Sequence, residues 1–383
     1  MRHLMSRIIL FANGACVLSI GVIRLHQSST NRRRRCGSLQ NRLKVNRHTF
    51  LMVSASTSEP LVNDPLLTRI PLEHEAVFYP YGFPVRIHSN SATTLKAAER
   101  SWGTYRHRYD EQPLEIRLVL SDSSSPGCVE PPVFRSQGHL LSIVADRENF
   151  AFLDLNAGFG FGWATEATAQ NQEYFRQCLL DVMVYPLLEI GHLITLHAAC
   201  VMHQGKGILL AGNSGAGKSS LSYACASRGW TFVSDDASAF QRNARDLKVI
   251  GHPQKFRFRE PVGELFPEFR HLKSTIRAYG KPTIEVSTRM IENFNSAEEG
   301  PVNAIVFLNR PAHEPGPPVL IPLSPEESWN RLVFSVWAVQ MPAFEQRLAA
   351  LERLLAIPSY ELRYSEFNPA IDLLERLVEE QLD

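Results

Sequence analysis

Short apolar segments separated by turn residues extend from about residue 60 to residue 165. Five of them alternate or run apolar in the way β-strands do: 76–79, 85–88, 114–120, 140–144 and 150–155. The stretch 91–102 has helical spacing and begins at Ser91, a residue type that caps helices. Residues 146–149 predict a hairpin loop between the last two strands. This part of the chain is therefore predicted to be β-rich with one helix.

Gly158, Gly160 and Gly162 alternate with aromatic residues just after the last of these strands. Their spacing is G-x-G-x-G, which differs from the dinucleotide-binding fingerprint, and no helical pattern follows directly. A strand or turn packed with aromatic rings is therefore favoured over a phosphate loop.

From residue 168 onward, helical and strand-like segments alternate. Residues 168–190 have helical spacing, and Pro186 is expected to kink or end that helix. The later strands are predicted at 194–202, 208–211, 230–236, 238–241, 248–250, 255–258, 282–286, 302–308 and 358–364, and the later helices at 218–228, 261–266, 326–337, 343–355 and 369–382. The short strands between 238 and 258 resemble a meander, and 302–308 is apolar on both faces, as a central strand is.

These patterns predict an α/β fold class. A mixed-sheet domain is expected at 168–383, preceded by a smaller β-rich α+β domain at 59–167.

The composition is that of a globular protein, with 44% hydrophobic and 21% charged residues. Residues 1–51 hold ten of the forty basic residues and no acid, so thirty basic and thirty-nine acidic residues remain, a net charge of −9. An acidic body argues against a nucleic-acid partner. Six cysteines without a C-x-x-C pair indicate neither a disulfide framework nor a zinc site, and they favour a cytoplasmic location.

Residues 1–58 are set apart from the fold. The apolar run 8–23 is short for a membrane span and lacks a cleavage pattern after it, and Arg32–Arg35 resembles part of a transit peptide. The alternatives are a disordered or mis-annotated extension with translation beginning at Met52, a membrane anchor at 8–23, and a basic tail.

The segment after the strand 208–211 carries the clearest chemical pattern. Its residues match G-x-x-x-x-G-K-[ST] in full and lie between a predicted strand and a predicted helix: Gly212, Asn213, Ser214, Gly215, Ala216, Gly217, Lys218 and Ser219, with Ser220 after them. Glycines allow the backbone amides to point inward and form an anion-binding nest at a helix N-terminus. Lys218 would contact the β- and γ-phosphates, and the Ser219 hydroxyl could bind Mg²⁺.

Asp235 and Asp236 end the predicted strand 230–236, seventeen residues beyond Lys218. One helix lies between, so this strand is expected to be adjacent to the one before the loop. Carboxylates at that edge could hold a metal ion or accept a proton.

Together these residues resemble HPr kinase/phosphorylase, a family related in fold to the phosphoenolpyruvate carboxykinases. The resemblance rests on His197-Ala-Ala, the loop, Arg228-Gly-Trp and Val233-Ser-Asp-Asp236, and it spans about 192–260. It implies a serine kinase that uses ATP and Mg²⁺, with Asp235 as the catalytic base, Asp236 assisting the metal and His197 lining the active site. From its residue type alone, a lone His on an apolar strand is more often a core residue.

Two departures from the family pattern stand out. Ser220 occupies the position where the HPr enzymes usually carry Glu, and no glycine- and arginine-rich signature of the bifunctional enzyme follows. The first departure favours, as the alternative, a regulatory module that binds ATP or GTP without catalysis. The second argues against reverse phosphorolysis. The acceptor is left open as a protein, peptide or small molecule, and so is a homo-oligomeric state.

Further cations downstream could contact phosphates. Lys255, Arg257 and Arg259 alternate and so share one face of a predicted strand, where a solvated face is the alternative. Lys281, at the head of the strand 282–286, is a further candidate phosphate contact.

Overall fold

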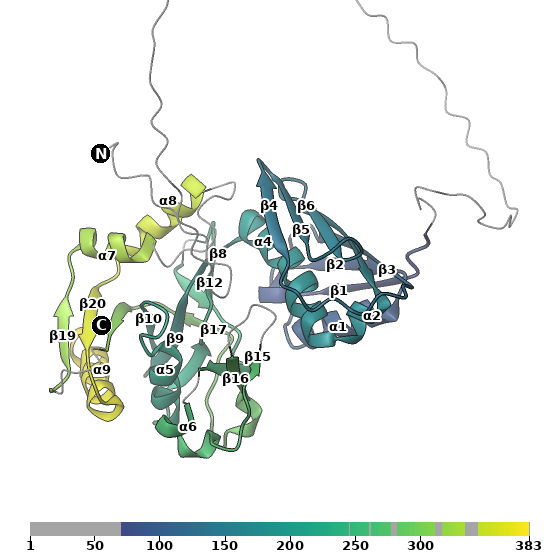
Figure 1. The fold of residues 1–383 in the computed structure, drawn as a ribbon. Coiled ribbons are helices and arrows are strands. Elements are labelled where there is room, and N and C mark those ends of the chain that lie inside the picture. The colour runs from purple at the N-terminus through teal and green to yellow at the C-terminus, as the bar shows by residue number, and fades with distance from the viewer. Residues whose placement is uncertain are drawn as a thin grey trace, which may run out of the picture. The chain divides into compact units, whose positions relative to one another are not determined.

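The computed structural model describes residues 70–244, 246–259, 262–276, 282–310, 316–333 and 344–382. Twenty strands in four sheets, together with helices, make up the described chain (Figure 1). The mixed α/β fold class agrees with the prediction. None of the described helices combines the length and the apolarity needed to cross a bilayer.

The N-terminal sheet has seven strands in the order β1-β2-β3-β7-β6-β5-β4. Their bounds are β1 His74–Phe78, β2 Val85–Ser89, β3 Leu114–Ser121, β4 Val133–Gln137, β5 Leu140–Val144, β6 Phe150–Asp154 and β7 Phe159–Thr165. The predicted strands are all confirmed, as is the strand reading of the Gly158–Trp163 stretch. Strand β4 was not predicted, because this edge strand is mostly exposed and so lacks an apolar alternation.

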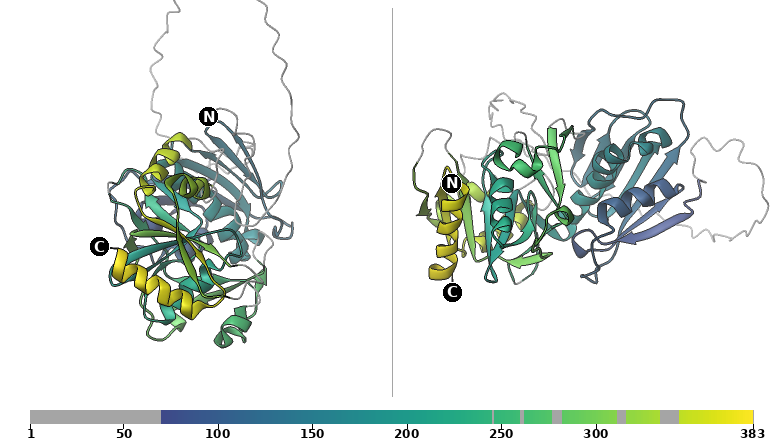
Figure 2. Two further views of the ribbon diagram at one scale, coloured as in Figure 1. Left: turned by 90° about the vertical axis from the view of Figure 1, so that its left-hand side faces the viewer. Right: turned by 90° about the horizontal axis from the view of Figure 1, so that it is seen from below.

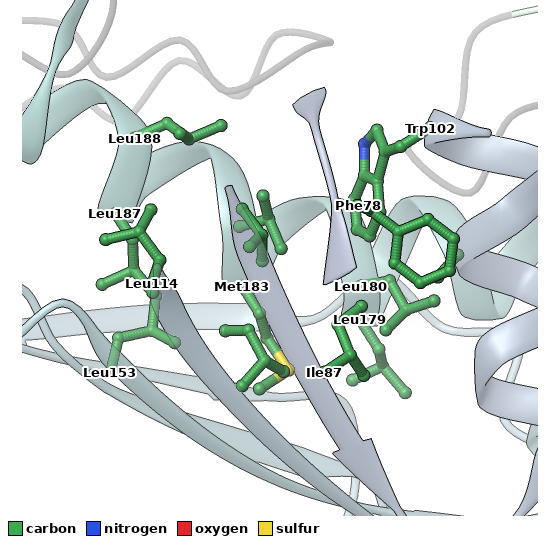
Figure 3. Close-up of a cluster of buried hydrophobic side chains, with 14 of the residues drawn as sticks. Phe78, Ile87, Trp102, Leu114, Leu153, Leu179, Leu180, Met183, Leu187 and Leu188 are labelled. Carbon is green, nitrogen blue, oxygen red and sulfur yellow. The ribbon is translucent and has the colours of Figure 1, made fainter. Parts of the chain in front are cut away.

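Helices cover one face of this sheet. They are η1 (Pro80–Gly82), α1 (Ala92–Trp102), α2 (Glu166–Gln170), α3 (Gln172–Phe175), the π-helical turn η2 (Arg176–Leu180) and α4 (Asp181–Gly191). Ser91 caps α1 as predicted, by accepting a hydrogen bond from the Thr93 amide. Apolar side chains of η2 and α4 pack against strand residues such as Ile87 and Leu153 in one buried cluster (Figure 3).

The prediction of a single helix over 168–190 is wrong, and the helix does not end at Pro186. Helix α4 continues through Pro186 to Gly191. The chain breaks earlier instead, at Asn171, whose side chain caps α3, and at η2, where the hydrogen bonds widen to a π-helical turn. Burial of the apolar face of α4 against the sheet compensates for the amide that proline lacks.

A second sheet has six strands in the order β11-β9-β10-β18-β20-β19. Their bounds are β9 Ala198–His203, β10 Lys206–Ala211, β11 Thr231–Ser234, β18 Ala304–Asn309, β19 Val319–Pro322 and β20 Ser359–Arg363. Helices α5 (Lys218–Ser227) and α9 (Phe367–Gln381) share a core with one face, and α7 (Pro325–Val333) and α8 (Phe344–Leu354) share a core with the other. Helix α9 is the yellow helix in both views of Figure 2. Strand β18 is central, as predicted, and runs parallel to both β10 and β20.

The single strand predicted over 194–202 is in fact two strands that belong to different sheets. Strand β8 (Leu193–Leu196) pairs with β12 (Ser238–Gln241), whereas β9 pairs with β10 and β11. The chain bends at His197, between the two. Because each half finds its own partner strand, one continuous apolar run supplies two sheets.

The predicted meander is also only partly correct. Strand β12 pairs with β13 (Lys248–Ile250) in a sheet of order β17-β13-β12-β8, with β17 at Glu299–Pro301. Strand β14 (Lys255–Phe258) instead pairs with β16 (Pro282–Ser287), which also pairs with β15 (Thr275–Ile276). The remaining short elements are α6 (Val262–Leu265), η3 (Pro267–Phe269) and η4 (Thr288–Met290).

Candidate functional site

The loop between β10 and α5 has the backbone geometry of an anion nest. Gly215 and Gly217 have φ angles of 93° and 95°, a left-handed conformation that side-chain-bearing residues seldom adopt. No side chain caps the N-terminus of α5. The first amides of this ten-residue helix are therefore available to a phosphate, which the positive end of the helix also attracts.

Lys218 folds back over this loop. Its side chain is buried, and Nζ donates hydrogen bonds to the carbonyl oxygens of Gly212, at 2.8 Å, and Asn213, at 3.3 Å. Burial lowers the pKa of Lys218 to about 8, although the charges of Asp236 and Asp235 act in the opposite direction. The ammonium group is thus held where a bound anion would stabilise its charged form.

Asp235 is a buried carboxyl group with one unpartnered oxygen. Its Oδ2 accepts a hydrogen bond of 2.7 Å from the backbone amide of Arg257, whereas Oδ1 has no hydrogen-bond partner among the described residues. Burial, followed by the charge of Asp236, raises the pKa of Asp235 to about 7, and the Ser219 hydroxyl, which approaches this carboxyl group without forming a hydrogen bond of good geometry, acts against this shift. Burying a carboxylate oxygen without a partner costs free energy, so a proton or a bound cation at this atom would be stabilising.

Asp236 has a different environment from its neighbour. His197 Nδ1 lies 3.1 Å from the Oδ1 atom of Asp236 and also 3.1 Å from the backbone oxygen of Asp236. Burial acts to raise the pKa of Asp236, but the hydrogen bond and charge of His197, with the charges of Arg257 and Lys218, outweigh it and lower that pKa. The two carboxyl groups therefore differ in proton affinity. Asp235 has the raised pKa that is typical of an acid–base residue, and Asp236 has the lowered pKa that is typical of an ionised ligand.

The structure brings together most of the predicted site residues, but not through adjacent strands. Strand β11, which precedes the two acids, lies beside β9, and β9 separates it from β10. The expectation that the two strands are neighbours is therefore wrong. The reason is that β9 and β10 form a hairpin, which places β9 between the phosphate loop strand and the acids. Because the chain bends at His197, the side chain of this residue contacts Asp236.

The three alternating cations of β14 and its end contact two different partners. Lys255 and Arg257 both pair with Glu285 on β16, whereas the Arg259 guanidinium donates a hydrogen bond to the Ser214 hydroxyl in the loop. Lys281 lies outside the described residues.

Sequence reasoning missed Arg310 and Tyr364. The Tyr364 hydroxyl donates to the Ala216 carbonyl oxygen at 3.4 Å, and the Arg310 guanidinium carbon lies 5.9 Å from the Tyr364 ring centroid and 4.8 Å from that of Phe367. Arg310 follows β18, which is parallel to β10. The shared edge at which parallel strands end is a signal that could have identified it.

One of three comparisons with known proteins gives a family match, and it covers this site. Residues 189–259 match the family model described as HPr Serine kinase C-terminal domain. A search of curated proteins gave no significant match. The solved structure of the Hpr(Ser) kinase/phosphatase from Coxiella burnetii is 17% identical, with 48% of this chain and 93% of that chain covered and a TM-score of 0.26, a value at which the likeness carries no argument.

The phosphate loop, His197, the two acids and Arg257 all lie inside the matched segment. From residue 189 to residue 259 the chain is HPr kinase-like, within a mixed α/β fold.

Proposed function

We propose that this protein is a kinase that transfers the γ-phosphate of ATP to a serine-type hydroxyl group. One observation carries the proposal: the buried Lys218 of a complete phosphate loop lies within electrostatic range of Asp235, a buried acid with an unpartnered oxygen. The family match over 189–259 supports the same reaction class.

The loop amides and Lys218 bind the β- and γ-phosphates. On binding, the Lys218 ammonium exchanges its contacts with the Gly212 and Asn213 carbonyls for phosphate oxygens. Positioning and charge neutralisation provide most of the catalysis in phosphoryl transfer, and a buried cation is effective because little water screens it.

The oxygen ligands at the site fit Mg²⁺. Within the described chain, no group of three or more His, Cys, Asp or Glu side chains is arranged to hold a metal ion by itself. The Ser219 hydroxyl and the ionised Asp236 would hold the ion, with phosphate oxygens and water completing its shell, as is usual for this cation. When bound, Mg²⁺ neutralises charge on the phosphates.

Asp235 takes the proton of the acceptor hydroxyl. The hydroxyl oxygen forms a bond to the γ-phosphorus as the bond from that phosphorus to the bridging oxygen breaks, and ADP leaves. The proton passes to Asp235, whose pKa of about 7 suits a base at neutral pH. Asp236 stays ionised beside it.

Two substitutions test this assignment. Lys218→Ala is expected to abolish ATP turnover, and Asp235→Asn is expected to retain ATP binding by calorimetry while phosphate transfer falls by about 10²-fold or more. Lys248→Ala, at a half-exposed lysine on β13, is the matched control and should behave as wild type. Full transfer by Asp235→Asn from γ-labelled ATP into a cell extract would refute the base assignment.

Ser220 supports a second candidate, a nucleotide-binding regulatory module, because the HPr enzymes usually carry Glu at that position. This candidate predicts that the protein binds ATP in a magnesium-dependent way but that neither proteins nor metabolites of the extract become labelled in the same assay.

A further inference from the structure

We propose that Lys255 and Arg257 bind an anionic group of the acceptor, so that the substrate is a small molecule carrying both a hydroxyl and a carboxylate or phosphate. This inference rests on the proposed kinase function and specifies which class of acceptor the site takes.

Strand β14 connects these two cations directly to the base. The Arg257 amide donates to Asp235 Oδ2 at 2.7 Å, and Lys255 lies two residues earlier, on the same face of the strand. A ligand held by both side chains is therefore close to the carboxyl group that would remove its hydroxyl proton.

One carboxylate is shared between the two cations. Lys255 Nζ lies 3.0 Å from Glu285 Oε2, and Arg257 Nε lies 3.3 Å from Glu285 Oε1. Within the described chain, each cationic side chain forms only this hydrogen bond. The ammonium and guanidinium groups therefore keep further N–H donors, which is the arrangement that binds a carboxylate or phosphate.

Other charged groups lie near the two cations, and the charges of Asp236 and Asp235 act on Arg257 after that of Glu285. Arg176 pairs with Glu173 at 3.0 Å, and its Nε also donates to the Ser101 hydroxyl, which in turn donates to Asp181 Oδ1. His252 lies nearby and carries no charge, because burial and the charges of Arg257 and Lys255 lower its pKa to about 3.

The two cations are partly buried, and aromatic rings lie near them. Lys255 and Arg257 retain only 22% and 31% of their side-chain exposure. The Tyr105 ring stacks on His252 at 4.7 Å, and the buried Tyr81 ring lies 5.6 Å from that of Tyr105. Aromatic side chains with a few polar groups are typical of small-molecule sites.

Tyr81 also has an unusual backbone. Its φ of 54° is in the left-handed region, which is strained for a bulky side chain. Such strain clusters at functional sites because the surrounding structure has to maintain it. It supports the reading of this aromatic group as part of a built site.

The test uses acceptors that share one skeleton and differ in charge. Wild-type protein with ATP and Mg²⁺ is assayed for phosphate transfer to glycerate, glycerol 3-phosphate, L-serine and neutral glycerol, and each compound's effect on Tm is measured without nucleotide. At least one anionic compound is expected to be phosphorylated or to raise Tm, with glycerol inactive at equal concentration. The acid that performs better identifies carboxylate or phosphate as the recognised group.

Substitution of Lys255 separates recognition from catalysis. Lys255→Gln is expected to raise KM for the anionic acceptor at least tenfold, with a smaller change in kcat and unchanged ATP affinity, and Lys255→Arg should restore part of the loss. Lys248→Gln on β13 is the control. The inference is overturned if glycerol is used as well as the acids, if only a protein is phosphorylated, or if no anionic compound binds or reacts in a Lys255-dependent way.

The two proposals fail differently. Absence of ATP binding by wild type, or of transfer to any molecule, refutes the kinase function itself. Transfer to a neutral or protein acceptor leaves the kinase function intact and refutes only the anionic acceptor.

Discussion

Asp235 combines burial with an unpartnered oxygen, and this pairing makes its protonation a property of folding as well as of catalysis. Its pKa is about 7 in the folded chain, against 3.8 for an ordinary aspartate. The folded state therefore binds the proton more tightly than the unfolded state, and stability falls as pH rises from about 4 to about 7. Above that range the full penalty of the buried charge is present.

Asp235→Asn removes this titration. We expect the nucleotide-free variant to be more stable than wild type at pH 8, by roughly 1 kcal/mol or more, and the gain to shrink towards pH 5. Urea unfolding at pH 5, 6 and 8 measures it, with Asp122→Asn, at an exposed aspartate, as the control. A gain that does not change with pH would mean that Asp235 is already ionised in the folded protein at pH 5.

The loop from β10 to α5 shows which parts of an element depend on local sequence and which on distant contacts. Gly215 and Gly217 share nearly the same left-handed φ, so alanine at either position introduces similar backbone strain. A Cβ on Gly217 would also lie 2.7 Å from the Tyr364 hydroxyl, whereas a Cβ on Gly215 would meet nothing within 4 Å.

We therefore expect Gly217→Ala to weaken ATP binding more than Gly215→Ala does. The shared strain amounts to about 1–2 kcal/mol in each variant. The excess should shrink when Tyr364→Phe is added to Gly217→Ala, because the clashing hydroxyl is then gone. Calorimetric titration with ATP and Mg²⁺ compares the three variants, and equal losses at the two glycines would show that Tyr364 does not limit the loop.

The same contrast explains what the sequence could predict. The phosphate loop, the strand before it and the helix after it follow from local residues, because glycines, Lys218 and the apolar run of β10 act within one short segment. The break at His197 and the insertion of β9 between β10 and β11 depend on pairing between distant strands, which periodicity does not encode. Tyr364 is in contact with the loop from more than 140 residues away, so no spacing rule would have placed it there.

At the scale of the whole molecule, one apolar core joins the N-terminal sheet to strands next to the site. Leu193 of β8, Ala239 of β12 and Ile250 of β13 belong to the same buried cluster as Leu188 and the strand residues of the seven-stranded sheet. Strand β8 leads into His197, and β12 follows Asp236 closely. Loss of packing in the N-terminal sheet should therefore be transmitted to the strands that support the acids.

This continuity predicts that the described chain unfolds in one transition that responds to two distant perturbations. Leu188→Ala leaves a cavity in that core and should destabilise the protein by about 2–5 kcal/mol. ATP with Mg²⁺ at a hundred times its dissociation constant should stabilise the folded state by about 2.7 kcal/mol. Differential scanning calorimetry should show both changes in the same peak, with Val129→Ala, at an exposed side chain, producing no shift. If ATP moved one peak and Leu188→Ala moved another, the two ends of the cluster would have to fold independently, and the acids would then be supported by the nucleotide-binding strands alone.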